Sequence, residues 1–231
     1  MKALKIYLLL ALLGYAFTGT AQERDPVTEQ VLWKRISLSK KLSPRFTANV
    51  APHLIIGDNI SRINSLLTDF GLSYKVNRNI SLKGTYRMGM RFTEGEPMNL
   101  RHQLLMNLST THRVASGLKV YYRLRYQSQS PEMLDFMNEE GRNAQNFIRN
   151  RIKVRYSINY YFRPWVTYEL FHRMGHRSRG NHLRNDRLLM GLDYRINDFN
   201  KLNFFAGVQN RRDRDDRPAR LIFGTSYSHS F

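Results

Sequence analysis

Apolar and basic side chains alternate along this chain, and a period of two residues restricts it to folds built from strands. In segment 80–92, apolar residues or glycine stand at the even positions, while Lys83, Arg87 and Arg91 stand at odd ones. Segment 148–158 repeats the pattern, with Asn150 as the one polar residue on its apolar face. Successive side chains of a strand point to opposite faces, so each segment has one apolar and one basic face. A helix would scatter those basic residues around its axis, and β-branched and aromatic residues also favour strands.

Such segments recur along the whole chain, and their length and spacing indicate a membrane barrel. Short connections (77–79, 159–163, 197–200) alternate with long ones (129–146, 175–183, 211–219), as in barrels with short periplasmic turns and longer outer loops. Strands of this length also suit a tilted membrane crossing. We therefore expect an all-β, transmembrane, antiparallel up-and-down barrel in the bacterial outer membrane. The eleven segments are 31–42, 44–55, 64–76, 80–92, 100–111, 117–128, 147–158, 164–174, 184–196, 201–210 and 220–231.

The strand number conflicts with a general rule. Bacterial barrels of this type normally have an even number of strands. Within a range of 10 to 12 strands we therefore expect ten, with segment 31–42 not fully spanning, or twelve, with residues 22–30 adding a short strand. The polar run 22–30 makes a poor lipid-facing strand, which favours ten.

Residues 1–21 have the features of a secretory signal peptide. Lys2 and Lys5 precede an apolar stretch at 6–17, and Gly19 and Ala21 are small residues at the −3 and −1 positions of a cleavage site. We expect cleavage before Gln22 and a mature barrel of residues 22–231. The alternative is a retained membrane anchor.

The formal charge of +19 and the absence of cysteine narrow the function classes. A strong positive charge raises the possibility of nucleic-acid binding, but export makes DNA or RNA an improbable partner. Without cysteine the chain has no disulfide scaffold, Cys-ligated zinc site or iron–sulfur site. We expect no cofactor.

Aromatic residues and the C-terminus add support for a membrane location. Aromatic side chains collect near the short turns, where interfacial girdles need them. The last strand alternates and ends on Phe231, which resembles the C-terminal signal read by the barrel assembly machinery. The competing interpretation is a soluble exported β-barrel or β-sandwich, with its apolar face turned inward. The aromatic residues of the expected girdle are Tyr74, Tyr156, Tyr160, Tyr161, Phe162, Trp165, Tyr194 and Phe199.

Strand parity places many bases inside the barrel, because lipid-facing Arg or Lys near the midplane costs about 2–4 kcal/mol. The inward acids that parity assigns are Asp69, Glu169 and Asp193. Three acids cannot pair fourteen bases, so we expect a wet lumen, bound anions, or neutralisation by a loop. The inward bases are Lys75, Lys83, Arg87, Arg91, Arg101, Arg123, Arg125, Arg149, Arg151, Lys153, Arg155, Arg173, Arg187 and Arg195.

Two groups of loop residues carry further hypotheses. Loop 129–146 holds four acids and a helix-start pattern at Ser130-Pro131-Glu132. It could fold into the outer mouth and pair with lumen arginines, or remain a solvated loop. Basic outer loops could bind the phosphates of lipopolysaccharide, since arginine binds phosphate bidentately, or carry only solvated charge. The loop acids are Glu132, Asp135, Glu139 and Glu140, and the loop arginines are Arg177, Arg179, Arg184, Arg211, Arg212, Arg214 and Arg217.

The residues give weak support to an enzyme or a metal centre. An outer-membrane lipid hydrolase would need a nucleophile and a general base at the outer rim of the barrel. The candidate bases are His102 and His172 and the nearby serines are Ser128, Ser130 and Ser178, but no pair has the spacing of a known catalytic motif. His172, His176 and His182 could ligate one metal ion only if the loop 175–183 folded back on itself, because residues four apart on a strand are too far apart. We expect no catalytic residues and no metal.

Several segments together resemble the domain of unknown function 2490 family of outer-membrane β-barrels. The resemblance covers most of the mature chain and implies fold and location. That family carries no established activity, so no catalytic residue is transferred. The matching stretches are Trp33, 101–105 (RHQLL), 122–126 (YRLRY), 149–153 (RNRIK), 164–171 (PWVTYELF) and 191–194 (GLDY).

The sequence therefore leaves two main functions open. The arginine-rich lumen could bind or pass small anions. Alternatively, it could be a purely structural network of arginine, tyrosine and carboxylate groups.

Overall fold

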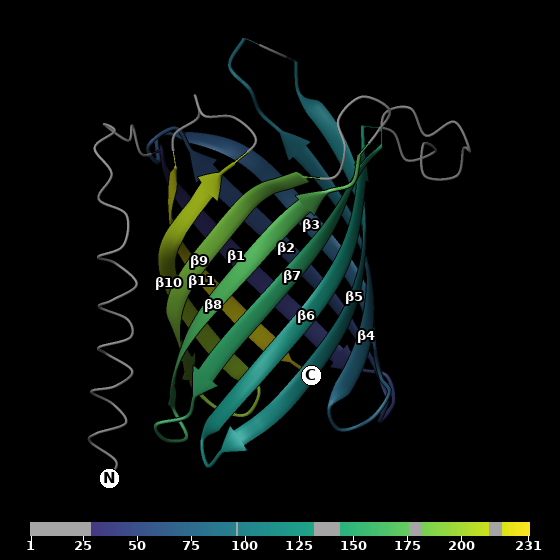
Figure 1. Cartoon of the computed structure of the whole chain (residues 1–231), viewed down its shortest axis with the longest axis vertical. Helices are drawn as coiled ribbons and strands as arrows, with labels where there is room; N and C mark the ends of the chain where they lie inside the picture. The colour runs from purple at the N-terminus through teal and green to yellow at the C-terminus, as the bar shows by residue number, and fades with distance from the viewer. Residues whose placement is uncertain (1–28, 96, 132–143, 176–181, 213–218) are drawn as a thin grey trace.

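A computed structural model describes residues 29–95, 97–131, 144–175, 182–212 and 219–231, and these form eleven strands in one closed barrel (Figure 1). Each strand pairs with its neighbours in the chain, so the fold is up-and-down, as the alternation predicts. None of the described residues form a helix long and apolar enough to cross a membrane. The strands are β1 (Glu29–Lys41), β2 (Phe46–Gly57), β3 (Arg62–Lys75), β4 (Ile80–Arg91), β5 (Asn99–Ala115), β6 (Leu118–Ser130), β7 (Gln145–Tyr156), β8 (Phe162–Arg173), β9 (His182–Arg195), β10 (Asn200–Arg211) and β11 (Arg220–Ser230).

The barrel closes through a parallel pairing of β1 with β11, from Glu29 beside Arg220 to Ser39 beside Ser230. In an odd-numbered up-and-down barrel the first and last strands run the same way, so the closing pair must be parallel. The described residues confirm a barrel within the expected range of 10 to 12 strands, and the count of eleven segments holds. The preference for ten or twelve within that range is wrong for the described residues. Segment 31–42 spans fully as β1. The expected signal peptide 1–21 and the residues that follow it to 28 lie outside the described residues.

The two ends of the barrel differ in their connections. The short turns and the C-terminus lie at the lower end in Figure 1, which we call the turn end. The other connections lie at the opposite end, which we call the loop end, and all of them except 58–61 are longer than those of the turn end. The turn-end connections are 42–45, 76–79, 116–117, 157–161 and 196–199.

In three of these short turns, an asparagine side chain accepts hydrogen bonds from the backbone of the turn in the same way. Asn77 Oδ1 accepts hydrogen bonds from the backbone N–H groups two and three residues later, both at 2.8 Å. Asn159 and Asn197 do the same at 2.8–3.0 Å. Such side-chain turns fix where a strand ends and the next begins. In the tightest turn, Gly117 adopts a φ of 79°, a conformation that disfavours other residues.

The outer face of the barrel is apolar. Met106, Ile152 and Leu72 have exposed fractions of 66%, 52% and 48%, and other large apolar side chains are exposed from β1 to β11. Inward positions on the same strands carry charges, for example Glu169 on β8. This arrangement is the reverse of a soluble barrel, and it suits a lipid environment.

A band of aromatic side chains surrounds the turn end. The Phe162 and Tyr194 rings lie 5.2 Å apart, and the Phe46 and Tyr74 rings 4.9 Å apart. Tyr160 donates a hydrogen bond to Asp198 Oδ1 at 2.5 Å, and this bond raises the pKa of the exposed Tyr160 hydroxyl. Trp165 does not belong to the band. Its position has the parity of the interior, and its ring is buried there.

Candidate functional site

The barrel encloses a cavity of about 680 Å³ that residues from every strand line. Ten lining lysines and arginines have the parity of the interior, and they face three carboxylates: Asp69, Glu169 and Asp193. These are the acids that the sequence assigns to the lumen. Most of the positive charge of the cavity wall therefore has no carboxylate of its own. The ten bases are Arg35, Lys83, Arg87, Arg123, Arg125, Arg149, Arg151, Lys153, Arg187 and Lys201.

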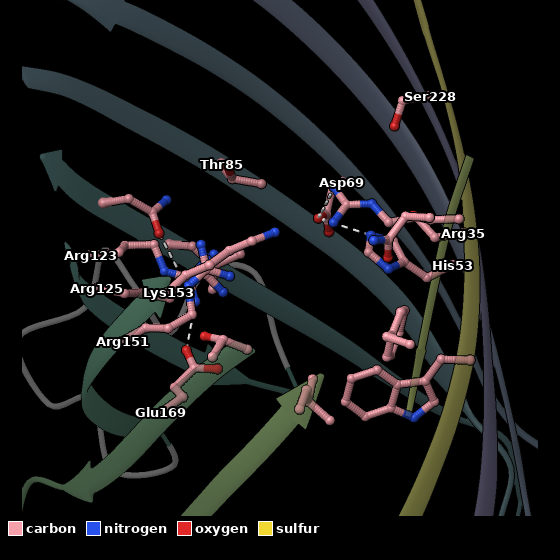
Figure 2. Close-up of a pocket in the computed structure, with 18 of the residues that line it drawn as sticks. Arg35, His53, Asp69, Thr85, Arg123, Arg125, Arg151, Lys153, Glu169 and Ser228 are labelled. Atoms are coloured by element: carbon pink, nitrogen blue, oxygen red, sulfur yellow. Dashed lines mark hydrogen bonds and ion pairs between the residues drawn. The ribbon is translucent and has the colours of Figure 1, made fainter. Parts of the chain in front are cut away.

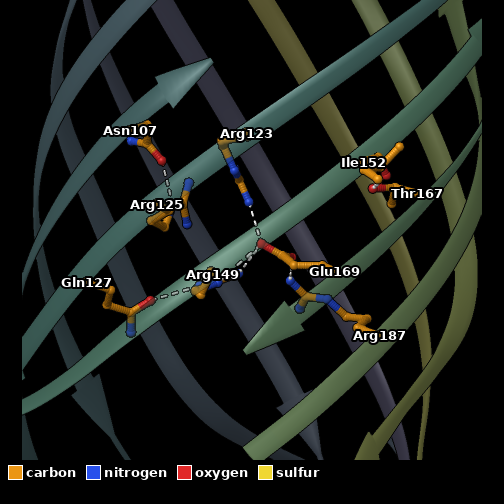
Figure 3. A network of polar contacts seen from close by, with 9 residues as sticks. All are labelled: Asn107, Arg123, Arg125, Gln127, Arg149, Ile152, Thr167, Glu169 and Arg187. Carbon is orange, nitrogen blue, oxygen red and sulfur yellow. Dashed lines mark hydrogen bonds and ion pairs between the residues drawn. The ribbon is translucent and has the colours of Figure 1, made fainter. Parts of the chain in front are cut away.

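Glu169 on β8 holds the densest group of cations (Figure 3). Its Oε1 accepts from Arg123 Nη2 at 2.6 Å and from Arg149 Nη2 at 3.0 Å. Its Oε2 accepts from Arg187 Nη2 at 2.5 Å. Arg187 stands directly opposite Glu169 in the β8–β9 register, and Arg149 also donates to Gln127 Oε1 at 2.8 Å. We call Glu169 with these three arginines the Glu169 cluster. With Glu169 only 2% exposed, it is a buried, charge-assisted network.

Asp69 on β3 forms a second centre across the cavity (Figure 2). Arg87, its register partner on β4, donates from Nε at 2.5 Å and from Nη2 at 3.0 Å. His53 Nε2 lies 3.0 Å from Asp69 Oδ2, and Arg35 Nη2 lies 3.8 Å from it. This group joins strands β1 to β4, whereas the Glu169 cluster joins β6 to β9.

Asp193 on β9 forms a third, looser centre. It accepts from Trp165 Nε1 at 3.1 Å and from Asn203 Nδ2 at 2.6 Å. The cationic groups of Lys153 and Arg155 each lie 3.9 Å from Asp193 Oδ2. Lys153 Nζ also lies 3.9 Å above the Trp165 ring, a cation–π contact.

Four lining cations differ from those around the carboxylates. Within the described part of the chain, no carboxylate oxygen lies within 4 Å of Lys83, Arg125, Arg151 or Lys201. Arg125 Nε donates to Asn107 Oδ1 at 2.6 Å, which leaves its two terminal nitrogens to the cavity. A hydrogen bond to a neutral amide fixes the guanidinium but does not offset its charge.

An aromatic wall completes the lumen on another side. The Phe205 ring lies 6.2 Å from the Trp33 ring and 6.2 Å from the Trp165 ring. Gly224 leaves room for Phe205, because a Cβ there would collide with its ring. Leu189 and Ile222 pack against the same group. This wall occupies part of the interior beside β1 and β8 to β11, and charged residues of β8 and β9, such as Glu169 and Arg187, line the cavity next to it.

The structure places eight of the fourteen predicted inward bases on the cavity wall. The other six do not line it: Arg155 pairs with Asp193, and Arg195 lies 3.5 Å from Asp198 at the turn end. Arg91 lines a separate hollow of about 350 Å³ at the loop end. Lys75, Arg101 and Arg173 lie near the strand ends.

Sequence reasoning missed three lining residues that carry a basic or histidine side chain at interior parity: Arg35, His53 and Lys201. Their strands alternate less clearly. In β1, for example, Val31 and Trp33 face inward while Ile36 and Leu38 are exposed, so apolar residues occupy both faces. Each missed residue has an odd number, as do the inward residues of its own strand. This shared parity could have predicted that all three face the lumen.

The loop hypotheses concern residues that are only partly described. Arg212 Nε donates to Asp186 Oδ1 at 2.6 Å, and Arg211 Nη2 lies 3.7 Å from Glu29 Oε2. Arg184 lies on β9, with its guanidinium 5.3 Å from the centre of the Phe147 ring. The remaining loop residues lie outside the described residues: Arg177, Arg179, Arg214, Arg217, Glu132, Asp135, Glu139 and Glu140.

The histidines considered for catalysis or metal binding lie near the loop end. His102 stands opposite Ser130 in the β5–β6 register, and its Nδ1 lies 2.7 Å from the Tyr86 hydroxyl. His172 and His182 lie on the adjacent strands β8 and β9, while His176 falls outside the described residues. No set of three or more metal-ligating side chains gathers within the described ranges.

Comparisons with known proteins agree with this geometry. The family model "Protein of unknown function (DUF2490)" matches residues 11–220, so the chain belongs to that family. Among solved structures, a structure of the NanC porin is similar with a TM-score of 0.52 and 14% sequence identity, over 83% of this chain and 93% of that one. At this identity the likeness concerns the fold. No curated protein matches the chain.

Proposed function

We propose that this DUF2490 barrel lies in the bacterial outer membrane and that its basic lumen binds or passes small anions. One observation carries the proposal: ten inward bases against three carboxylates around a cavity of about 680 Å³. A cleft lined by one sign of charge concentrates ions of the opposite sign. Rings of Arg and Lys are also the groups by which pores select anions.

The membrane location rests on the outer surface. Its exposed apolar side chains and the aromatic band at the turn end match the lipid-facing belt and interfacial girdle of outer-membrane barrels. The short turns then face the periplasm and the longer connections face outward. Outer-membrane lipid is accordingly the first partner, and the C-terminal strand ending at Phe231 would engage the barrel assembly machinery.

The structural alternative has its own support in the Glu169 cluster, whose four side chains tie β6, β7, β8 and β9 together. Both roles fit in one lumen. The clusters around Glu169 and Asp69 stabilise the wall, and the bases left without a carboxylate attract anions.

Single-channel recording in planar lipid bilayers tests the transport form of the proposal. Under a KCl gradient, the reversal potential should show that chloride permeates better than potassium. High salt should reduce this preference, because the Debye length falls to about 3 Å at 1 M. Absence of conductance, or cation selectivity, would contradict a role in passing anions.

We also propose that loop arginines contact lipopolysaccharide phosphate. Replacing Arg177, Arg179, Arg214 and Arg217 with Gln should lower the amount of lipopolysaccharide that co-purifies with the barrel. Arg212→Gln is a useful comparison, because Arg212 already has Asp186 as a partner and its loss should matter less. Unchanged co-purification in the fourfold variant would count against the contact.

A further inference from the structure

Three of the four lumen cations without a carboxylate oxygen within 4 Å lie in one sector of the barrel, and the fourth, Lys201, lies on β10. Arg125 and Arg151 are on the neighbouring strands β6 and β7, and Figure 2 shows their side chains together beside Arg123. In the β6–β7 register, Arg125 faces Arg149 and Arg151 faces Arg123, so Arg125 and Arg151 are diagonal neighbours. Arg151 also stands opposite Glu169 in the β7–β8 register, but the structure gives no ion pair between their side chains. Diagonal positions across a strand pair are about 7–8 Å apart, well within reach of two arginine side chains.

Lys83 borders the same sector from β4. It pairs in register with Asn107, and Asn107 pairs in register with Arg125 on its other side. The Asn107 side chain links the two, since its Nδ2 donates to the Lys83 carbonyl at 3.1 Å and its Oδ1 accepts from Arg125. The charges of Arg35, Arg125 and Arg123 repel Lys83, and the carboxylate of Asp69 attracts it from further away. Within the described residues, three positive charges therefore border one part of the cavity with no carboxylate oxygen within 4 Å of any of them.

The donors of this sector suit an oxyanion better than a halide. Arg125 is held through Nε by Asn107, so both of its terminal nitrogens are presented as a fork. No hydrogen bond within the described residues engages the Arg151 guanidinium, and Lys83 adds an ammonium with three rotatable donors. Guanidinium forks bind carboxylate and phosphate bidentately, which a spherical chloride ion cannot match.

We infer that Lys83, Arg125 and Arg151 form a seat for one compact divalent oxyanion, a phosphate or a small dicarboxylate. The inference rests on the proposed function and deepens it by naming the site and the ligand class. A divalent ligand suits the seat because it offsets most of three positive charges, whereas a monovalent ion leaves two of them. The clusters around Glu169 and Asp69 hold the wall on either side, so the seat is formed before the ligand arrives.

Isothermal titration calorimetry on the folded barrel in detergent tests the seat. Inorganic phosphate, succinate and chloride are titrated in turn at constant ionic strength. We expect saturable binding of phosphate or succinate and none of chloride. In the variant Arg125→Gln/Arg151→Gln, the affinity should fall about tenfold or more, because two charge-assisted donors are lost. The matched control Arg78→Gln/Arg113→Gln removes the same charge from exposed positions at the turn end and should bind as the wild type does.

Folding of each variant is checked by its heat-dependent migration on gels. If the double variant does not fold, Lys83→Gln is measured instead and should also lower the affinity. Wild-type affinity in the folded double variant, or in Lys83→Gln, would overturn the seat, as would failure of the wild type to bind either divalent ion. Reversal potentials of the same proteins separate the two proposals. If the lumen is anion-selective but neither divalent ion binds at the seat, the seat is overturned and the proposed function stands.

Discussion

The Glu169 cluster and the seat formed by Lys83, Arg125 and Arg151 occupy neighbouring parts of one lumen but treat their charges differently. In the cluster, a carboxylate with 2% exposure accepts from three guanidinium groups at 2.5–3.0 Å. In the seat, no carboxylate oxygen of the described residues lies within 4 Å of the three cations, and Arg125 donates to the neutral amide of Asn107. The difference teaches that an inward arginine can stabilise the wall or attract a ligand, according to whether a carboxylate lies beside it.

Glu169→Gln should have the largest effect on stability. The change leaves three buried guanidinium groups without their carboxylate, and breaking a buried pair in this way costs about 3–5 kcal/mol. Denaturant unfolding in detergent should show the loss. Glu94→Gln is the control, because Glu94 pairs with Arg62 on the exposed surface, where water screens the pair, and its loss should leave stability close to that of the wild type. Equal stability of Glu169→Gln and the wild type would show that the cluster does not hold the wall.

Asp69→Asn should destabilise the barrel by a smaller amount, about 1–3 kcal/mol. Asp69 keeps fewer buried partners than Glu169, since the Arg35 side chain is 38% exposed and water can solvate it. The same unfolding experiment ranks the two variants. A loss larger than that of Glu169→Gln would reverse the order of importance assigned to the two centres.

Arg151→Gln should leave stability within about 1 kcal/mol of the wild type. Within the described residues the Arg151 guanidinium makes no hydrogen bond or close ion pair, and repulsion by Arg149, Arg187 and Arg35 offsets its attraction to Glu169. Arg149→Gln in the neighbouring cluster should be clearly destabilising, since Arg149 donates to both Glu169 and Gln127. Unfolding midpoints of these two variants compare the sectors directly. If Arg151→Gln were as destabilising as Arg149→Gln, the seat would belong to the structural network.

Local alternation was enough to predict the strands and much of the lumen. Side-chain parity is a property of each strand alone, so it assigned Asp69, Glu169 and Asp193 to the interior without knowledge of the neighbours. The same parity places Trp165 inside with Glu169, four positions later on one strand. The girdle prediction for Trp165 failed because it used distance from a turn and ignored parity.

The remaining features depend on how strands register with one another. Which arginines meet Glu169 is decided by the relative shift of β6 to β9, which no single segment reveals. The expected range of 10 to 12 strands includes the eleven that the described residues form, but the choice of an even number within it failed because the even-number rule replaced a direct count. Because β1 pairs with β11 in parallel, an odd number of strands can close the barrel, and the even-number rule does not apply to the described strands.

The most direct test of the central claim uses the two tryptophans of the chain, Trp33 and Trp165, which both line the cavity. Their fluorescence is measured with iodide and with caesium as quenchers, in the folded barrel and after denaturation. A basic lumen concentrates anions and excludes cations. Iodide should therefore quench the folded protein about threefold or more strongly than caesium, and denaturation or high salt should reduce the difference. Equal quenching by the two ions, including none by either, or stronger quenching by caesium would contradict an anion-accepting lumen.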